Sequence, residues 1–152
     1  MAENEKLLEG LQKIVTELAQ QEDCHFIQSR IFKAQGLTKL ADKYLEHANE
    51  EREYIEKCID RLLDFGCDVK NGTKQESPTY KDAVEWIKYD FQVSKDGLNW
   101  LKELVVLAKD DLKTYDMLKE YYIDEEEDMY WAEQQLELIE KIGLTNWYAT
   151  LL

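Results

Sequence analysis

Apolar side chains recur at three- and four-residue steps along nearly the whole chain, and few helix-breaking residues interrupt them. This spacing places the apolar side chains on one face of an α-helix. The clearest example contains Leu118, Tyr122, Met129, Ala132, Leu136 and Ile139. Six glycines and a single proline occur in 152 residues, which favours a few long helices over many short elements. The sequence therefore predicts an all-α fold.

Signals at helix ends divide this pattern into four long helices and a short fifth one, in a single domain that covers residues 1–152. The expected helices span about 4–35, 38–65, 78–108, 111–142 and 144–151. A glycine after an apolar stripe is a stop signal, a Ser-Pro pair is typical of a helix start, and an aspartate can cap a helix. These signals are Gly36, Gly66, Ser77–Pro78, and Asp110 or Asp111.

The connection between the second and third helices contains the stretch GCDVKNGTKQE, which is polar and has no helical period. Roughly a dozen residues at about 3.3 Å each can just span a helix of about 40 Å. The connection can therefore cross over along the length of the bundle, and a slack hairpin would fit as well.

The net charge of −14 argues against nucleic acid or an anionic membrane surface as the partner. It is compatible with cation binding, although solubility is the commoner reason for such a charge. The N-terminal sequence lacks the pattern of a signal peptide, and no apolar run is long enough to span a bilayer. Cys24, Cys58 and Cys67 show no CxxC spacing. A cytoplasmic protein with reduced thiols is expected.

Polar side chains interrupt the apolar stripe near the middle of each long helix. Glu125 stands where the period requires an apolar residue, and Asp128 lies three residues further on the same face. In an antiparallel bundle such mid-helix positions share one height. In the helix at 4–35 the corresponding positions are Glu22, His25 and Ser29. In the helix at 38–65 they are His47 and Glu51, with Tyr54 beside them, and in the helix at 78–108 the position is Ser94.

A metal ion is one way to compensate carboxylates that are buried together, because their uncompensated burial costs several kcal/mol. Carboxylate oxygen suits hard cations, and imidazole adds affinity for iron, zinc or manganese. A polar centre without metal is the alternative, with the acids protonated, hydrated or bonded to Tyr54, Tyr122 and Ser94. His47 is expected at a bundle edge or on the subunit surface and is not counted as a ligand.

Two long segments resemble bacterioferritins. Residues 123–148, IDEEEDMYWAEQQLELIEKIGLTNWY, are similar to the C-terminal part of that family. Residues 30–66, RIFKAQGLTKLADKYLEHANEEREYIEKCIDRLLDFG, are similar to its second-helix region. The resemblance implies a ferritin-like four-helix bundle with a long crossover after the second helix and a short C-terminal helix. It also implies a hollow homo-oligomeric shell of 24 subunits that stores iron, with or without a second ferritin-type subunit.

The family's di-iron ferroxidase centre is only partly present at the matching positions. Glu51 and Glu125 match its two motif glutamates, whereas Tyr54 and Asp128 occupy the places of its two motif histidines. Ser94 falls where the third helix carries a glutamate in the family.

The first helix matches this centre ambiguously, because Glu17 aligns with the family glutamate only if one residue is inserted. Arg52 replaces the methionine that binds haem in the family, so haem is not expected. The predicted metal ligands are therefore Glu51, Glu125, Asp128, Glu22 and His25, with Glu17 and Tyr54 as weaker candidates.

The expected function is iron storage and detoxification of the bacterioferritin kind, with iron as the ion and with an altered or inactive ferroxidase centre. One alternative is a non-catalytic structural or binding protein on the same fold. Another is a different carboxylate-metal oxidase or a peroxidase of the rubrerythrin type, against which the missing CxxC motif counts.

Overall fold

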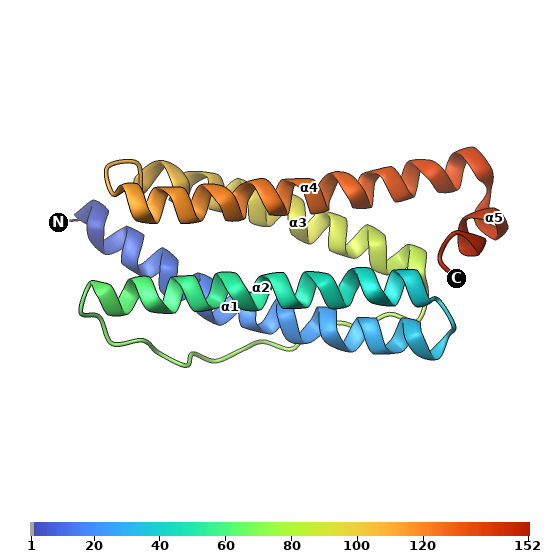
Figure 1. Ribbon diagram of the computed structural model, residues 1–152, viewed down its shortest axis with the longest axis horizontal. Coiled ribbons are helices and arrows are strands. Elements are labelled where there is room, and N and C mark those ends of the chain that lie inside the picture. The colour runs from blue at the N-terminus through green and yellow to red at the C-terminus, as the bar shows by residue number, and fades with distance from the viewer. Residues whose placement is uncertain (1) are drawn as a thin grey trace.

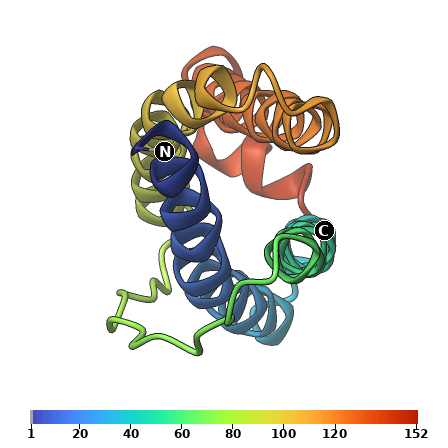
Figure 2. The same cartoon turned by 90° about the vertical axis from the view of Figure 1, so that its left-hand side faces the viewer.

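The computed structural model describes residues 2–152, with side chains from Asn4 onward, and confirms the all-α four-helix bundle (Figure 1). α1 packs mainly on α2, and α3 packs mainly on α4. The helices of each pair run antiparallel, and Figure 2 shows the bundle from its end. The five helices are α1 (Ala2–Ala34), α2 (Thr38–Asp64), α3 (Ala83–Leu107), α4 (Leu112–Ile142) and α5 (Leu144–Ala149).

Three of the helices end at glycines with a positive φ angle. Gly36, Gly66 and Gly143 have φ angles of 81°, 74° and 80°. A residue without a Cβ atom adopts this left-handed conformation at little cost, which makes glycine the usual residue just after a helix. Asp111 is the cap of α4, because its side chain accepts a hydrogen bond from the backbone N–H of Thr114.

The third helix begins at Ala83, so the predicted start at Pro78 is wrong. Asp82 is the N-cap, and its Oδ1 accepts hydrogen bonds from the backbone N–H groups of Val84 at 2.8 Å and Glu85 at 3.1 Å. The Ser-Pro pair lies instead in the connection that precedes the helix.

The connection between α2 and α3 runs the length of the bundle (Figure 1), so it is a crossover and not a hairpin. Glutamine side chains of α1 hold its backbone in place. Gln28 exchanges two hydrogen bonds with the backbone of Tyr80, at 3.0 and 2.5 Å. These bonds satisfy extended backbone groups and explain why the segment is not helical. The complete set pairs Gln12 with Lys70, Gln20 with Gln75, Gln28 with Tyr80, and Gln35 with Lys81.

Removal of the Gln28 amide is expected to loosen the crossover. Gln28 is completely buried, so Gln28→Ala leaves both backbone groups of Tyr80 without partners, at a cost of about 1–3 kcal/mol. Gln35→Ala is the control, because its single bond to Lys81 is solvent-exposed. Thermal unfolding of both variants checks this, and equal midpoints would contradict it.

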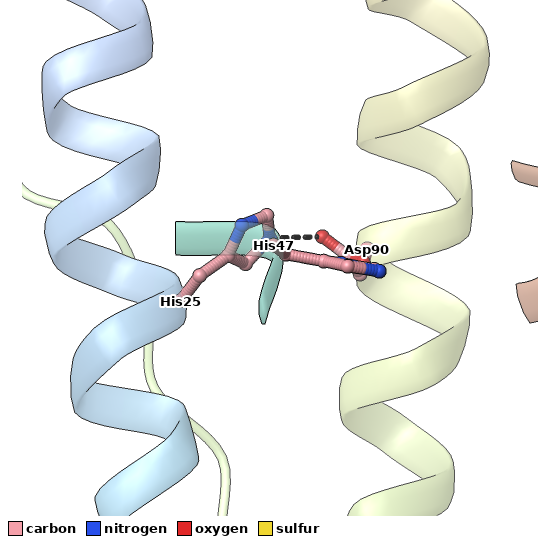
Figure 3. Close-up of side chains that lie close together, drawn as sticks. All are labelled: His25, His47 and Asp90. Atoms are coloured by element: carbon pink, nitrogen blue, oxygen red, sulfur yellow. Dashed lines mark hydrogen bonds and ion pairs between the residues drawn. The ribbon is translucent and has the colours of Figure 1, made fainter. Parts of the chain in front are cut away.

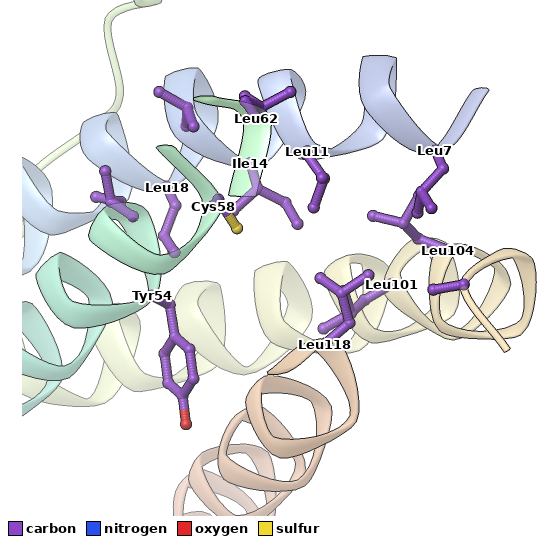
Figure 4. Close-up of a cluster of buried hydrophobic side chains, with 13 residues drawn as sticks. Leu7, Leu11, Ile14, Leu18, Tyr54, Cys58, Leu62, Leu101, Leu104 and Leu118 are labelled. Atoms are coloured by element: carbon purple, nitrogen blue, oxygen red, sulfur yellow. The ribbon is translucent and has the colours of Figure 1, made fainter. Parts of the chain in front are cut away.

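Two apolar clusters occupy the two ends of the bundle. One contains Leu11, Leu18, Leu62, Leu101 and Leu118, with neighbours shown in Figure 4. The other contains Phe32, Tyr44, Trp86, Ala132 and Trp147. In α2, α3 and α4 the predicted polar residues lie between the two clusters along the chain, and Glu22 does so in α1. His25 and Ser29 follow Cys24, which belongs to the second cluster. These mid-helix polar residues are called the polar layer below.

None of the helices in residues 2–152 is long and apolar enough to cross a membrane.

Candidate metal centre

The polar layer is built around His25, whose imidazole lies between two buried carboxylates. Nδ1 pairs with Glu51, and Nε2 lies 2.8 Å from Oδ1 of Asp90. The three side chains come from α1, α2 and α3 and are only 3–5 % exposed. Tyr44 donates a hydrogen bond to the other oxygen of Asp90 at 3.3 Å. Three helices are thereby joined through one imidazole.

Burial and the neighbouring charges have opposite effects on the pKa values of His25, Asp90 and Glu51. Burial lowers the pKa of His25, but the charges and hydrogen bonds of Glu51 and Asp90 outweigh it and raise the pKa well above 6.5. Burial also raises the pKa of Asp90, yet His25 and Tyr44 bring it below its usual value. Burial raises the pKa of Glu51, and the attraction of His25 offsets this only in part. One imidazolium thus compensates two carboxylates incompletely.

His47 belongs to the same cluster, so its predicted position at a bundle edge or on the surface is wrong. Its side chain is buried, and one ligand atom each from His25, His47 and Asp90 lie within 4.8 Å of one another (Figure 3). Nε2 of His47 lies 3.3 Å from Oδ1 of Asp128, but without the geometry of a hydrogen bond. The rings of Tyr44 and Trp131 enclose the imidazole.

Glu125 lies beside this cluster. It lines a small cavity of about 80 Å³ together with Glu17 and Ser94, so α1, α3 and α4 all contribute to this cavity. Burial raises the pKa of Glu125 well above its usual value, and the charges of Glu51 and Asp128 raise it further. Three of the positions suggested by the family motif, Glu17, Ser94 and Glu125, therefore line one cavity, although Glu17 is exposed.

Glu22 and Tyr54 have other partners. Arg52 donates a hydrogen bond from Nε to Glu22 at 2.9 Å, and the Arg52 side chain is 55 % exposed. The Tyr54 hydroxyl donates to the carboxylate of Asp124. These contacts draw both predicted ligands away from the imidazole cluster, and a ligand role for them stays a prediction.

Several buried atoms in the polar layer have no hydrogen-bond partner. They include Oε2 of Glu51, Oε2 of Glu22 and Nε2 of His47. A buried carboxylate oxygen or imidazole nitrogen without a partner is costly, and both are good ligands for a transition-metal ion. The donor set therefore fits a divalent cation.

The sequence reasoning missed Asp90 entirely. Asp90 follows Trp86 by four residues and precedes Ser94 by four, which is the spacing of one helical face. Trp86 and Ser94 are both buried. This spacing is the signal that could have identified it.

A bundle of four long helices with an end-to-end crossover and a mid-bundle layer of carboxylates and imidazoles is the architecture of ferritin-like proteins. The family model for the ferritin-like domain matches residues 8–142. The bacterial ferritin of Neisseria meningitidis serogroup B is 31 % identical over the full length of both chains. The bacterial ferritin of Synechocystis sp. is 33 % identical over 97 % of this chain and 92 % of its own. That of Pseudomonas aeruginosa is 27 % identical over 93 % and 94 %.

The chain therefore belongs to the ferritin-like family. Iron storage and assembly into oligomeric shells are general properties of ferritins.

Proposed function

We propose that this chain is a subunit of a hollow iron-storing shell whose bundle centre binds Fe²⁺ at an altered site. The meeting of Glu125, Glu17 and Ser94 at one cavity next to the buried Glu51 is the observation that carries the proposal. Burial raises the pKa values of Glu51 and Glu125, so it disfavours their charged forms, and a bound cation would offset this cost.

Fe²⁺ is the substrate in this proposal. The carboxyl groups of Glu51 and Glu125 bind it, with Asp128 nearby. Dioxygen or peroxide takes up the electron, and the ferric product moves on to the interior of the shell. The absence of the family's two motif histidines leaves fewer nitrogen ligands, so oxidation is expected to be slower than at a complete centre. A second, co-assembled ferritin-type subunit could then supply rapid oxidation.

A non-catalytic structural subunit is the second candidate. The pairing of His25 with both Glu51 and Asp90 favours it, because the imidazolium compensates part of the buried negative charge without a metal. In that case the centre serves to stabilise the bundle, and the protein contributes to the wall of the shell.

The size of the assembly tests the shell. A shell of 24 copies of an 18.0 kDa chain has a mass of about 430 kDa. Light scattering during size-exclusion chromatography is expected to give this value. A monomer or a dimer would contradict storage, because a cavity requires a closed assembly.

Iron oxidation tests the centre. Glu51→Ala/Glu125→Ala is expected to slow aerobic Fe²⁺ oxidation by about tenfold or more relative to the unchanged protein, because both motif carboxylates are lost. Glu53→Ala/Glu127→Ala is the control, since both side chains are exposed on the same two helices. Equal rates for the first pair and the unchanged protein would show that the centre does not oxidise iron.

A further inference from the structure

We propose that His25, His47 and Asp90 form a mononuclear site for a divalent transition-metal ion, with ligands other than the carboxylate pair Glu51 and Glu125, although Glu51 contacts His25. None of the three residues stands at a position of the family's di-iron motif. The site requires only the folded bundle, so it does not depend on shell assembly or on iron storage.

The donor set defines the kind of ion. Two imidazoles and one carboxylate are typical of Fe²⁺, Zn²⁺ and Co²⁺ sites with room for a further ligand. Mg²⁺ and Ca²⁺ prefer oxygen ligands alone. The three side chains are 3–5 % exposed and come from three different helices (Figure 3). Their ligand atoms, all within 4.8 Å of one another, can surround one ion after small side-chain movements.

Two of the three residues, His25 and Asp90, also have a hydrogen-bonded neighbour that orients them. His25 pairs through Nδ1 with Glu51, which leaves Nε2 facing Asp90. Tyr44 donates to the second oxygen of Asp90. Nε2 of His47 lies 3.3 Å from Asp128 without a hydrogen bond, so this nitrogen stays available to an ion. Metal-bound histidines usually have a carboxylate on the other ring nitrogen, and such partners fix the ring orientation. An ion that enters takes the place of the proton between His25 and Asp90.

A cavity connects this cluster with the bundle surface. Its volume is about 590 Å³, and both His25 and Asp90 line it. α1, α3 and the crossover form its walls, with Glu17, Cys24 and Gln75 among the lining residues. This volume is far larger than an ion, and the cavity offers an ion a route to His25 and Asp90, two of the three proposed ligands. The acidic side chain of Glu17 on this route favours a cation over an anion.

Co²⁺ binding tests the site through spectroscopy and not through activity. At half an equivalent per subunit, the intact protein is expected to show the visible absorption of low-coordinate Co²⁺. X-ray absorption of the same sample is expected to show two imidazoles per ion. His47→Ala and Asp90→Asn are each expected to weaken Co²⁺ binding by about tenfold or more. Glu127→Gln is the control, because Glu127 is exposed on α4, and it is expected to bind Co²⁺ as the unchanged protein does.

The possible results distinguish a failure of this metal site from a failure of the proposed iron-storage function. An oxygen-only X-ray absorption spectrum, or His47→Ala binding Co²⁺ like the unchanged protein, would overturn the site and leave the proposed storage function intact. Co²⁺ bound through two imidazoles by a protein that forms no shell would overturn storage and support the site. Thermal unfolding shows whether each variant is folded. If a variant does not fold, the X-ray absorption spectrum of the unchanged protein alone tests whether two imidazoles bind the ion.

Discussion

His25→Ala is expected to reduce the free energy of unfolding of the subunit by about 3–5 kcal/mol. The imidazole is the only cationic partner in contact with the buried Glu51 and Asp90 among residues 4–152. Removal of one member of a buried ion pair leaves its partner charged and desolvated, which is the source of this cost. Urea denaturation of the purified protein measures the loss.

His47→Ala is the control for this prediction, because His47 is equally buried but makes no hydrogen bond. We expect it to cost clearly less than His25→Ala, because it removes packing and one close contact with Asp128 but no buried hydrogen bond. Equal losses for the two variants would show that the ion pairs around His25 contribute little.

The stability that His25 contributes is expected to depend on pH in a definite direction. The pKa of His25 is raised in the folded protein, so the protonated imidazole adds stability that is fully present below about pH 6.5. This contribution is lost as the pH rises through the raised folded value. The difference in stability between the unchanged protein and His25→Ala is therefore expected to shrink toward alkaline pH. A difference that grows with pH would contradict the assignment of a protonated His25.

Trp147→Ala is expected to cost about 3–5 kcal/mol and to detach α5 from the end of the bundle. The Trp147 side chain is completely buried, and its Nε1 donates a hydrogen bond to Oε1 of Gln135 at 3.0 Å. Removal of a large buried aromatic side chain leaves a cavity that neighbours fill only in part. α5 has six residues, too few to be stable without this anchor.

Tyr148→Ala serves as the comparison, because the Tyr148 side chain is only half-buried in the same short helix. We expect a smaller loss of stability and no increase in proteolysis of the C-terminal segment. Limited proteolysis followed by mass spectrometry distinguishes the two variants, and equal resistance would show that Trp147 does not hold α5.

The helices could be predicted because their signals are local. A three- and four-residue apolar period marks each buried face, and Gly36, Gly66 and Gly143 mark three helix ends. The start of α3 could not be predicted in this way. The backbone of Tyr80 bonds to Gln28, which is 52 residues away in the chain, and a local Ser-Pro signal says nothing about such a distant partner.

The sequence predicts where along the helices the polar residues of the site lie, but it does not predict which of them contact one another. Glu51 and Glu125 stand out because acids interrupt apolar stripes there. His47 lies between Tyr44 and Glu51 on the same helical face, but only the packing of rings from other helices turns that face inward. His25 pairs with Asp90 because the rotation of α3 about its axis turns Asp90 inward.

The four glutamines of α1 also set the length of the crossover. From Gln12 to Gln28 the helix rises about 24 Å, and the chain from Lys70 to Tyr80 can extend to about 33 Å. The segment between these two attachments therefore has about 9 Å of slack, which is shared between the parts on either side of Gln75, held by Gln20. Inserted residues would lengthen these parts and leave the attached ends in place. The crossover can thus vary in sequence and size while the four helices keep their alignment.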